Sequence, residues 1–368
     1  MSVSVNGTSG LTFNDATTQN TSAFYGGLAF RNRIINGAMM IDQRNAGASV
    51  TPTNGQYLVD RFTYNATQAS KVTAQQNAGS VTPPVGFSSY QGITSSSAYS
   101  VVASDYFILQ QRIEGLNMAD LAWGTASAAT VTLSFWVRSS LTGTFGGSVY
   151  NSAFDRSYPF TYTIISANTW EQKSVTIAGP TAGTWTISNS AYMAVSFSLG
   201  AGSTYSGAAG SWSSSAYFTA TGATSVVGTS GATFYITGVQ LEKGSTATSF
   251  DYRPYGTELA LCQRYYYNWT QGYPNEGVAV GQNYNTTDCY PIIYLKVPMR
   301  TQPSATVSAG GTFSKLGGAA WGGASIAATG PQTISLLMTT TGLVSGGAQN
   351  VLGTSSVVPF VITASAEL

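Results

Sequence analysis

Apolar and polar residues alternate most regularly between residues 233 and 241. Apolar side chains stand at positions 234, 236, 239 and 241, with mostly polar residues between them. The alternation slips by one position at Gly238. Period-two alternation is typical of a half-buried strand, and one extra residue in a strand makes a bulge. The pattern therefore predicts a strand over Thr233–Leu241 with a bulge at Gly238.

A short helix is predicted soon after this strand. A Lys-Gly turn follows the strand, and an extended run then ends at Pro254. Thr257 is a suitable N-cap, the residues after Glu258 are apolar, and Arg264 closes the pattern. We therefore expect one helix over Thr257–Arg264, leading from the last strand of one domain into a new segment.

Upstream of this strand, similar patterns recur at short and even intervals, separated by Gly, Pro and Asn turn signals. One helical interruption is predicted among them, at Asn117–Trp123. Many short strands with even spacing indicate an antiparallel β-sandwich. The predicted strands are Tyr57–Tyr64, Tyr99–Ile113, Ala129–Arg138, Gly143–Phe154, Ser157–Ile165, Glu171–Ile177, Ala191–Leu199, Ser215–Thr221 and Thr233–Leu241.

Downstream of the helix, the pattern predicts a second, smaller β domain. Gly, Ala, Ser and Thr dominate between Gly310 and Gly347, a composition that specifies strand register weakly. We expect this stretch to be ordered by packing against other subunits or to carry exposed loops. The predicted strands of this domain are Tyr265–Trp269, Gly277–Val280, Tyr290–Val297, Ser304–Val307, Thr333–Leu337 and Pro359–Ala364.

The predicted organisation has three parts. Residues 30–256 form the sandwich, and residues 257–368 form the helix with the smaller β domain. In residues 1–29, Val3 and Val5 and later Leu11 and Phe13 alternate with polar residues around turn signals. A hairpin of this size is not stable alone, so residues 1–29 are expected to pack on a partner.

Composition narrows the class of protein. The 368 residues suffice for two or three domains, and hydrophobic residues make up 43% of them. Only 8% are charged, and the net charge of +1 gives no overall field to attract nucleic acid. The 41 glycines and 22 tyrosines fit many strands joined by tight turns. Because low charge makes a free monomer poorly soluble, an oligomer or a larger particle is expected to cover part of the surface.

The sequence shows no targeting signal and has too few cysteines to define the class of protein further. The start of the chain lacks the pattern of a secretory signal peptide, and no run has the length of a membrane span. The two cysteines, Cys262 and Cys289, are too few for a disulfide scaffold. Cys262 is expected to be a small buried residue, and a disulfide between the two remains open.

Four motifs resemble one protein family. FYITGVQLEKGSTATSFDYRPYGTELALCQRYY at 234–266 looks like the end of the jelly-roll domain in tailed-phage virion appendage proteins of the tail-fibre or adhesin type. NRIINGAMMIDQRNAG at 32–47 resembles the start of that domain. QRIEG at 111–115 and VTLSFWVRSS at 131–140 resemble its middle.

The resemblance implies a fold and a setting. The fold is all-β: an antiparallel jelly-roll sandwich plus a smaller C-terminal β domain, with one short linking helix. The first and last segments of the jelly roll are expected to lie side by side, so that both ends of the domain meet. The resemblance further implies a homotrimer in the virion, assembled in the host cytoplasm. It also implies that residues 1–29 attach to other virion proteins. The low net charge and the lack of a long apolar run predict neither nucleic-acid binding nor membrane insertion.

The sequence argues against an enzyme. It contains no histidine, and no P-loop or dinucleotide-binding glycine motif. A glycan-cleaving enzyme needs two carboxylates roughly 5 to 10 Å apart, but the acids are few and scattered. Most acids have a basic neighbour in the sequence, which predicts structural ion pairs. The predicted pairs are Asp42 with Arg44, Asp60 with Arg61, Arg112 with Glu114, Asp155 with Arg156, and Asp251 with Arg253.

No metal or other cofactor is predicted. Jelly-roll carbohydrate modules often hold a calcium ion near the domain ends through carboxylate and backbone oxygens. Asp42, Glu242 and Asp251 are the acids in that region. With so few carboxylates, the absence of a metal is the favoured interpretation.

Exposed aromatic side chains are the candidates for glycan binding, because sugar C–H faces stack on flat rings. Of the seven tryptophans, Trp136 lies inside a predicted strand beside Leu133 and Phe135 and is expected to be a core residue. Trp123 and Trp170 flank predicted strands and are expected to be structural. Two tryptophans and three tyrosines lie in loop-like sequence, where an oligomer interface is an equal alternative to glycan contact. These candidates are Trp212, Tyr205, Trp321, Tyr273 and Tyr284.

These observations favour a phage fibre or appendage subunit that adheres to the host cell surface, through envelope glycans. The alternative is a structural head or collar fibre, or a capsid decoration protein, without receptor binding. A polysaccharide-degrading spike has the least support, since short regular repeats are absent.

Overall fold

The structure is a computed structural model that describes residues 30–273, 276–309, 312–315, 319–353 and 360–368. It also describes three short strands near the N-terminus: β1 (Ser4–Asn6), β2 (Gly10–Thr12) and β3 (Thr18–Gln19). These pair antiparallel, which confirms the predicted hairpin. The other predicted positions in residues 1–29 lie outside the described residues.

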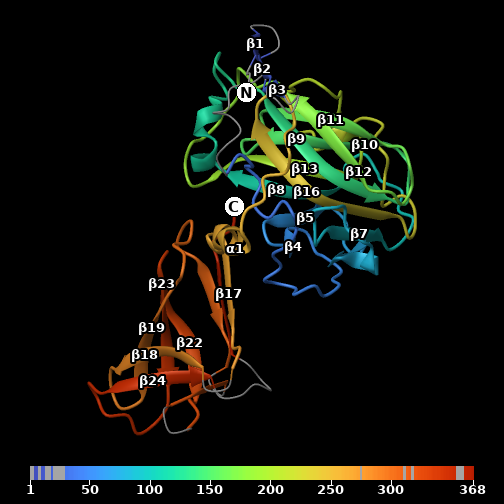
Figure 1. Ribbon diagram of the computed structural model, residues 1–368. Coiled ribbons are helices and arrows are strands. Elements are labelled where there is room, and N and C mark those ends of the chain that lie inside the picture. The colour runs from blue at the N-terminus through green and yellow to red at the C-terminus, as the bar shows by residue number, and fades with distance from the viewer. Residues whose placement is uncertain are drawn as a thin grey trace.

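Figure 1 shows a large β-sandwich and a smaller β domain joined by helix α1 (Tyr255–Gln263). This arrangement confirms the predicted fold class: antiparallel sheets that form a jelly-roll sandwich, a C-terminal β domain and one α-helix in the described part of the chain. No helix among the described residues is both long and apolar enough to cross a membrane.

The sandwich consists of two antiparallel sheets, and the chain passes repeatedly from one to the other. The six-stranded sheet has the order β11 (Ser157–Ile164), β10 (Gly143–Asn151), β13 (Ala191–Ala201), β8 (Tyr106–Glu114), β5 (Phe62–Ala66) and β4 (Gln56–Val59). The five-stranded sheet has the order β12 (Glu171–Ile177), β9 (Val131–Ser139), β16 (Thr233–Lys243), β7 (Gln91–Ser95) and β6 (Val72–Gln76).

The core lies between these two sheets. Alternate residues of each strand face inward, as the period of two requires. On β8, Phe107 and Leu109 are buried in this core, and on β9 so are Phe135 and Val137. Two short strands, β14 (Ser206–Gly207) and β15 (Thr219–Ala220), pair outside the two sheets.

The bulge predicted at Gly238 is present. The pairing of β16 with β9 shifts between Thr237 and Gln240, and Gly238 has a φ of +61°. The predicted proximity of the first and last segments is also confirmed. The Arg33 amide donates to the Leu241 carbonyl at 2.8 Å, and the Val239 amide donates to the Gly37 carbonyl at 2.9 Å.

The predicted helices are shifted or broken. α1 begins at Tyr255, with Pro254 rather than Thr257 at its N-cap position. The fixed φ of proline suits the start of a helix, which accounts for the earlier beginning. Asn117–Trp123 is not a helix but lies across two 3₁₀ turns, Gly115–Asn117 and Ala119–Leu121.

The C-terminal domain has its own core between two sheets, including Trp321, Leu336 and Ile362. Its three-stranded sheet has the order β17 (Tyr266–Thr270), β25 (Val361–Ser365) and β20 (Ser304–Val307). Its six-stranded sheet has the order β21 (Phe313–Ser314), β24 (Ala348–Gly353), β18 (Gly277–Asn283), β19 (Asp288–Tyr294), β23 (Thr333–Thr339) and β22 (Gly323–Thr329). The expectation of exposed loops between Gly310 and Gly347 is wrong for β22, whereas β23, which pairs with it, confirms the predicted strand Thr333–Leu337.

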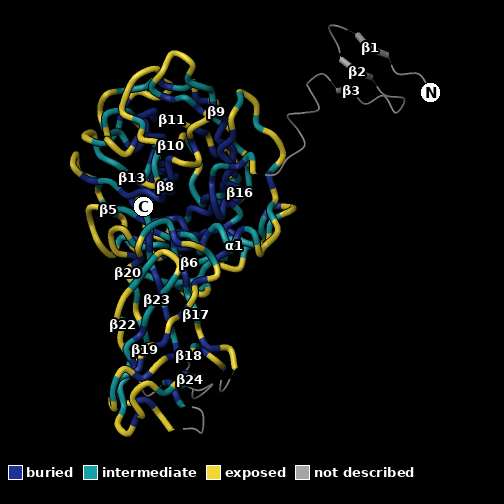
Figure 2. Tube along the Cα trace, turned by 90° about the vertical axis from the view of Figure 1, so that its left-hand side faces the viewer, coloured by how far each residue is buried: buried dark blue, intermediate teal, exposed yellow. Residues whose placement is uncertain are grey.

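Polar contacts join the two domains around the C-terminal end of the chain. Arg264 donates two hydrogen bonds to the Glu114 carboxylate, at 2.6 and 2.9 Å, and the Tyr265 hydroxyl donates a third at 2.6 Å. The carboxylate of Glu367 pairs with Arg44 and Arg61 of the sandwich. In Figure 2 the C-terminus accordingly lies beside the sandwich strands. Ionic groups therefore help to hold the domains together, beside the apolar packing of Ile35 and Ile41 against Tyr265.

The ion pairs predicted between sequence neighbours are wrong. Asp60 lies 3.6 Å from Arg44 and not beside Arg61, Glu114 pairs with Arg264, and Arg253 pairs with Glu258. Among the described ion pairs, none joins Asp42 to Arg44 or Asp155 to Arg156.

Both cysteines are buried free thiols, so the structure contains no disulfide between them. Cys262 packs with Ile35, Ile41 and Tyr265, as expected of a small buried residue. Burial raises its pKa well above the usual value of a thiol.

Candidate glycan-binding surface

An exposed apolar surface covers β18 and β19 of the C-terminal domain. Along β19 the side chains alternate strictly, and the residues between the buried ones point outward. Tyr290, Ile292 and Tyr294 are 38%, 45% and 76% exposed. On β18, Val280 and Gln282 are exposed in the same way. These five side chains, with Tyr284 just after β18, are named the tyrosine face.

The tyrosine face has two ends. β18 and β24 lie at the end of the domain farthest from the sandwich (Figure 1). Shortly after β19 the chain reaches Arg300, which donates to the Asn189 carbonyl of the sandwich at 2.7 Å. The Tyr294 end therefore lies nearer the sandwich, and the Tyr284 end lies farther from it.

The far end contains an open groove of about 420 Å³, lined by Gln282, Asn283, Tyr284, Tyr290, Ser345 and Gly346. The rings of Tyr284 and Tyr290 stand perpendicular, at 89°, with their centroids 6.0 Å apart. Tyr284 is 74% exposed. Gln282 lies directly opposite Tyr290 in the strand register and also lines the groove. Two ring faces and an amide thus border one groove.

Asn283 adds a buried polar atom to this groove. Its side-chain nitrogen donates to the Val344 carbonyl at 2.8 Å, and its amide nitrogen donates to Gly347 at 2.8 Å. Its side-chain oxygen is buried and has no hydrogen-bond partner within the described protein. A buried acceptor without a partner is costly, so a ligand hydroxyl that reaches it would gain a hydrogen bond.

The near end contains a second groove, of about 380 Å³, whose lining includes Trp269, Val280, Ile292, Tyr294 and Lys296. Trp269 comes from β17 and is half-buried, with its indole nitrogen 3.4 Å from a Glu276 carboxylate oxygen. This groove is the more apolar of the two. Together the grooves place an aromatic side chain at each end of the tyrosine face.

Uncharged polar side chains flank the apolar stripe. Thr333 and Ser335 of β23 lie opposite Tyr294 and Ile292 in the register. Asn350 of β24 lies opposite Val280 on the other side. Partners opposite each other in a sheet share one face, so hydroxyl and amide groups border the stripe on both sides. This combination of rings and uncharged hydrogen-bonding groups suits a sugar, which has apolar C–H faces and equatorial hydroxyls.

Two of the five predicted site residues are confirmed as exposed. These are Tyr284, in the far groove, and Tyr273, which is 78% exposed between β17 and β18. Among the described residues, Tyr273 borders neither groove of the tyrosine face and makes no ring contact with Tyr284 or Tyr290.

The prediction that Trp321 is exposed is wrong. The side chain is 1% exposed and lies in the core of the C-terminal domain. The glycines and alanines around it suggested a loop, but the chain there leads into β22 and places the ring under the sheet. Trp321 is therefore a core residue.

Trp212 and Tyr205 are half-buried rather than freely exposed. Trp212 packs edge-on against Trp123 and Trp185 at 5.5 and 5.8 Å, and its indole donates to the Ala178 carbonyl at 2.7 Å. Tyr205 stacks on Phe218 at 5.2 Å. Both rings have neighbours that the loop sequence did not reveal, so neither offers an open face like that of Tyr284.

The prediction that Trp136 lies in the core is wrong. Leu133, Phe135 and Val137 face the core, and strict alternation turns Trp136 to the outer face of the sheet, where it is half-buried. The sequence pattern already indicated that Trp136 points outward, because its three apolar neighbours occupy the inward side of the strand. Its register partner Gln172 borders a polar groove of about 380 Å³ with Ser174 and Thr248.

The carboxylates weighed for calcium are occupied by protein donors. Asp42 accepts the amides of Asn45 and Gly47, at 2.9 and 2.8 Å. Glu242 accepts the amide and hydroxyl of Thr248. Asp251 accepts the Asn32 amide at 3.2 Å. In the described part of the chain, no three ligand-type side chains gather in a way that could hold a metal.

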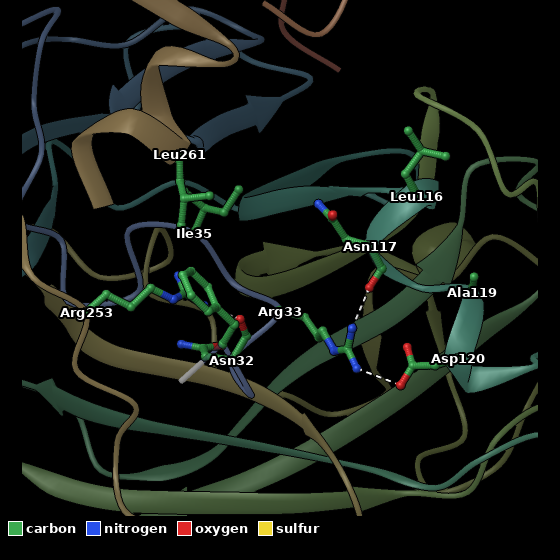
Figure 3. A pocket seen from close by; sticks show the side chains of 10 residues that line it. Asn32, Arg33, Ile35, Leu116, Asn117, Ala119, Asp120, Arg253 and Leu261 are labelled. Carbon is green, nitrogen blue, oxygen red and sulfur yellow. Dashed lines mark hydrogen bonds and ion pairs between the residues drawn. The ribbon is translucent and has the colours of Figure 1, made fainter. Parts of the chain in front are cut away.

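A further pocket lies where the start of the sandwich meets α1 (Figure 3). It measures about 380 Å³ and is bordered by Arg33, Asp120, Arg253 and Leu261 among others. Arg33 donates to the Asn117 carbonyl and to Asp120, both at 2.7 Å. Arg253 pairs with Glu258. Both guanidinium groups already pair with protein carboxylates, although their Nε atoms have no hydrogen-bond partner among the described residues. This pocket also presents no pair of exposed rings, so it is the weaker candidate for binding a sugar.

Two carboxylates at the domain junction have shifted pKa values. Burial raises the pKa of Asp60 to about 6, although hydrogen bonds from Gln43 and the charge of Arg44 oppose the shift. For Glu114, burial alone would raise the pKa, but hydrogen bonds from Arg264 and Tyr265 outweigh it and lower the pKa. Both carboxylates accept hydrogen bonds within the junction between the domains, so their role there is structural.

Comparison with known proteins gives distant structural likenesses. No protein-family model matches the sequence, and no curated protein matches it. The enzymatically active domain of bacteriophage CBA120 tailspike protein 4 has a TM-score of 0.31 and 15% identity, over 58% of this chain and 22% of the tailspike chain. The chain thus spans about a fifth of that tailspike's length.

Carbohydrate-binding modules show similar scores. TmCBM61, solved with β-1,4-galactotriose, has a TM-score of 0.30 and 10% identity, over 58% of this chain and 100% of that one. The family 11 module of Clostridium thermocellum, solved with a mixed-linked tetrasaccharide, has a TM-score of 0.28 and 9% identity, over 53% and 96%. At such scores and identities, the function of this chain has to be argued from its own residues.

Proposed function

We propose that this protein is a fibre or appendage subunit of a tailed phage and binds glycans of the host envelope through the tyrosine face. One observation carries the binding proposal: an exposed stripe of rings, with Tyr284 and Tyr290 around an open groove, is flanked by uncharged hydrogen-bonding groups. Sugars present apolar faces and hydroxyls together, so they complement both parts of this surface.

The phage setting rests on the sequence motifs at 32–47, 111–115, 131–140 and 234–266. The same resemblance leads us to propose that the protein is a homotrimer in the virion. Residues 1–29 would attach it to other virion proteins. The far end of the tyrosine face lies at the end of the C-terminal domain away from the sandwich (Figure 1), so the sandwich does not cover it.

The proposed activity is binding without cleavage. The far groove is lined by amide, hydroxyl and aromatic groups, none of which is a carboxylate. Buried carboxylates at the junction, such as Glu114, are engaged by arginine and tyrosine donors. The proposed mechanism is therefore adhesion by stacking and hydrogen bonding.

A binding assay tests the proposal. The full chain is applied to a panel of bacterial cells and to their extracted surface polysaccharides. A double variant, Tyr284→Ala with Tyr290→Ala, is compared with Tyr255→Ala, whose ring is 60% exposed on α1 away from the tyrosine face. Wild type and the control should bind one polysaccharide alike, and the double variant about tenfold or more weaker.

Other outcomes point elsewhere. Release of reducing ends would contradict adhesion without cleavage. If the double variant instead changes the oligomeric state measured by light scattering, the face is an interface between subunits. If wild type binds no cell and no polysaccharide, the structural fibre or decoration role replaces adhesion.

A further inference from the structure

We infer that the tyrosine face recognises a neutral polysaccharide along its length, over several sugar residues, rather than a terminal sugar or an acidic glycan. This inference rests on the proposed function and specifies its ligand. It follows from the length of the face, from its flanks and from its charge.

The face is too long for one sugar. Tyr290, Ile292 and Tyr294 follow each other at two-residue steps on β19. At about 3.3 Å per residue, the Cα atoms of Tyr290 and Tyr294 lie roughly 13 Å apart. Each end also opens into its own groove, of about 420 and about 380 Å³. A single sugar ring in one groove leaves the other groove empty, whereas a chain of linked sugars can occupy both.

Both grooves are open surfaces rather than closed cavities, as their exposed linings show. Tyr284 and Tyr294, one in each groove, are 74% and 76% exposed, and Val280 is 64% exposed. A terminal sugar is typically enclosed on several sides, but an open groove lets the polymer continue at both ends. The flanking Thr333, Ser335 and Asn350 follow the stripe and can reach hydroxyls along a chain.

The charge of the face selects neutral sugars. The far groove has no charged side chain in its lining, and the near groove has one, Lys296. The carboxylate closest to the far groove in sequence, Asp288, accepts a hydrogen bond from Asn285 at 2.8 Å and another from Thr287. Tight recognition of carboxylate or phosphate groups uses paired arginines or lysines. Such a pair is missing from the linings of both grooves, so uncharged hydroxyls are the better match.

A length series tests the inference. A neutral surface polysaccharide that the full chain binds is partially hydrolysed, and fragments are sorted from monosaccharides to long oligosaccharides. Affinities are measured by calorimetry at low and high salt. We expect the affinity to rise about tenfold or more from the monosaccharide to fragments that span both grooves, with little dependence on salt.

Variants at the two ends locate the contacts. Tyr294→Ala should lower the affinity for long fragments severalfold. It should leave the affinity for the shortest fragments that bind unchanged. Tyr284→Ala should lower the affinity for both long and short fragments, and Tyr255→Ala should change neither affinity. Circular dichroism spectra and melting temperatures show whether each variant is folded.

The failures are distinguishable. Equal affinity for monosaccharide and polymer overturns the inference but leaves glycan binding intact. Exclusive binding of uronate or phosphate polymers, lost at high salt, also overturns it. Binding to no polysaccharide at all refutes the proposed function, and with it this inference.

Discussion

Arg61 of the sandwich and Glu367, the penultimate residue of the chain, form a buried ion pair across 306 positions of sequence. The same carboxylate accepts a hydrogen bond from Arg44 at 2.9 Å. The Arg61 guanidinium also lies over the Tyr265 ring, 3.6 Å from its centroid. Because Glu367 follows β25 of the C-terminal domain, this pair fastens the end of one domain to the interior of the other.

Removing the carboxylate should destabilise the protein strongly. In Glu367→Ala, the Arg61 side chain, 1% exposed, loses its anionic partner. Leaving a buried charge uncompensated costs about 3 to 5 kcal/mol, so the midpoint of denaturation by urea should fall. The matched control is Lys243→Ala, which removes an ion pair with side chains 49% and 46% exposed and should cost less than about 1 kcal/mol. Equal effects of the two variants would show that the junction pair is not critical.

Asp60 should make stability depend on pH in an unusual direction. Its pKa in the folded protein is raised from 3.8 to about 6. Between these values the folded state binds a proton that the unfolded state does not, so this contribution to stability is present at low pH and is lost as the pH rises through about 6. The full effect is up to about 3 kcal/mol.

The comparison with Asp60→Asn isolates this effect, because groups far from Asp60 titrate equally in both proteins. The free energy of unfolding of wild type minus that of the variant should decrease between pH 4 and 7, and most steeply between pH 4 and 6. A difference that increases with pH over this range would mean that Arg44 dominates over burial and lowers the pKa.

Gly238 should tolerate no side chain. Its φ is +61°, and a Cβ atom there would lie 2.7 Å from the Phe87 ring and 3.0 Å from the Trp136 ring. Gly238→Ala should therefore lower stability by about 1 to 3 kcal/mol, measured by thermal unfolding. Gly256→Ala is the control, because Gly256 lies in α1 with open space around it and alanine favours the helix. This control should be neutral or stabilising. A mild effect at Gly238 would mean that the strand can repair the bulge.

The periodic parts of the chain were predictable, and the reason is physical. A strand with one face in the core has apolar residues at the inward positions, so its sequence reveals which face is buried. On β16 these residues are Phe234, Ile236, Val239 and Leu241. β6 and β7 were missed because their sequences, VTAQQ and QGITS, carry few apolar residues. Their places in the sheet come from pairing with each other and with β16. Tertiary pairing of this kind leaves little trace in the local sequence.

The candidate site was predictable only in part for the same reason. Tyr284 followed from its polar, turn-rich neighbourhood, and its exposure is confirmed. Tyr290 and Tyr294 were assigned to a strand, but which side of that strand is covered depends on the rest of the sheet. The ion pairs failed because adjacent side chains point to different sides of the chain, so Asp60 and Arg61 face different partners.

Trp321 should matter for folding and not for ligand contact. Its side chain is 1% exposed, and its indole nitrogen has no hydrogen-bond partner in the described structure. Trp321→Phe loses no hydrogen bond and should keep the C-terminal domain folded at a moderate cost. Trp321→Ala leaves a large cavity and should cost about 3 to 5 kcal/mol. Thermal unfolding measures both, and glycan binding is measured well below the melting temperature of each variant.

Binding by Trp321→Phe should match wild type, because the tyrosine face lies on the opposite side of the sheet from the core that holds this ring. If the folded Trp321→Phe variant loses binding, then the ring reaches the ligand in a conformation other than this one.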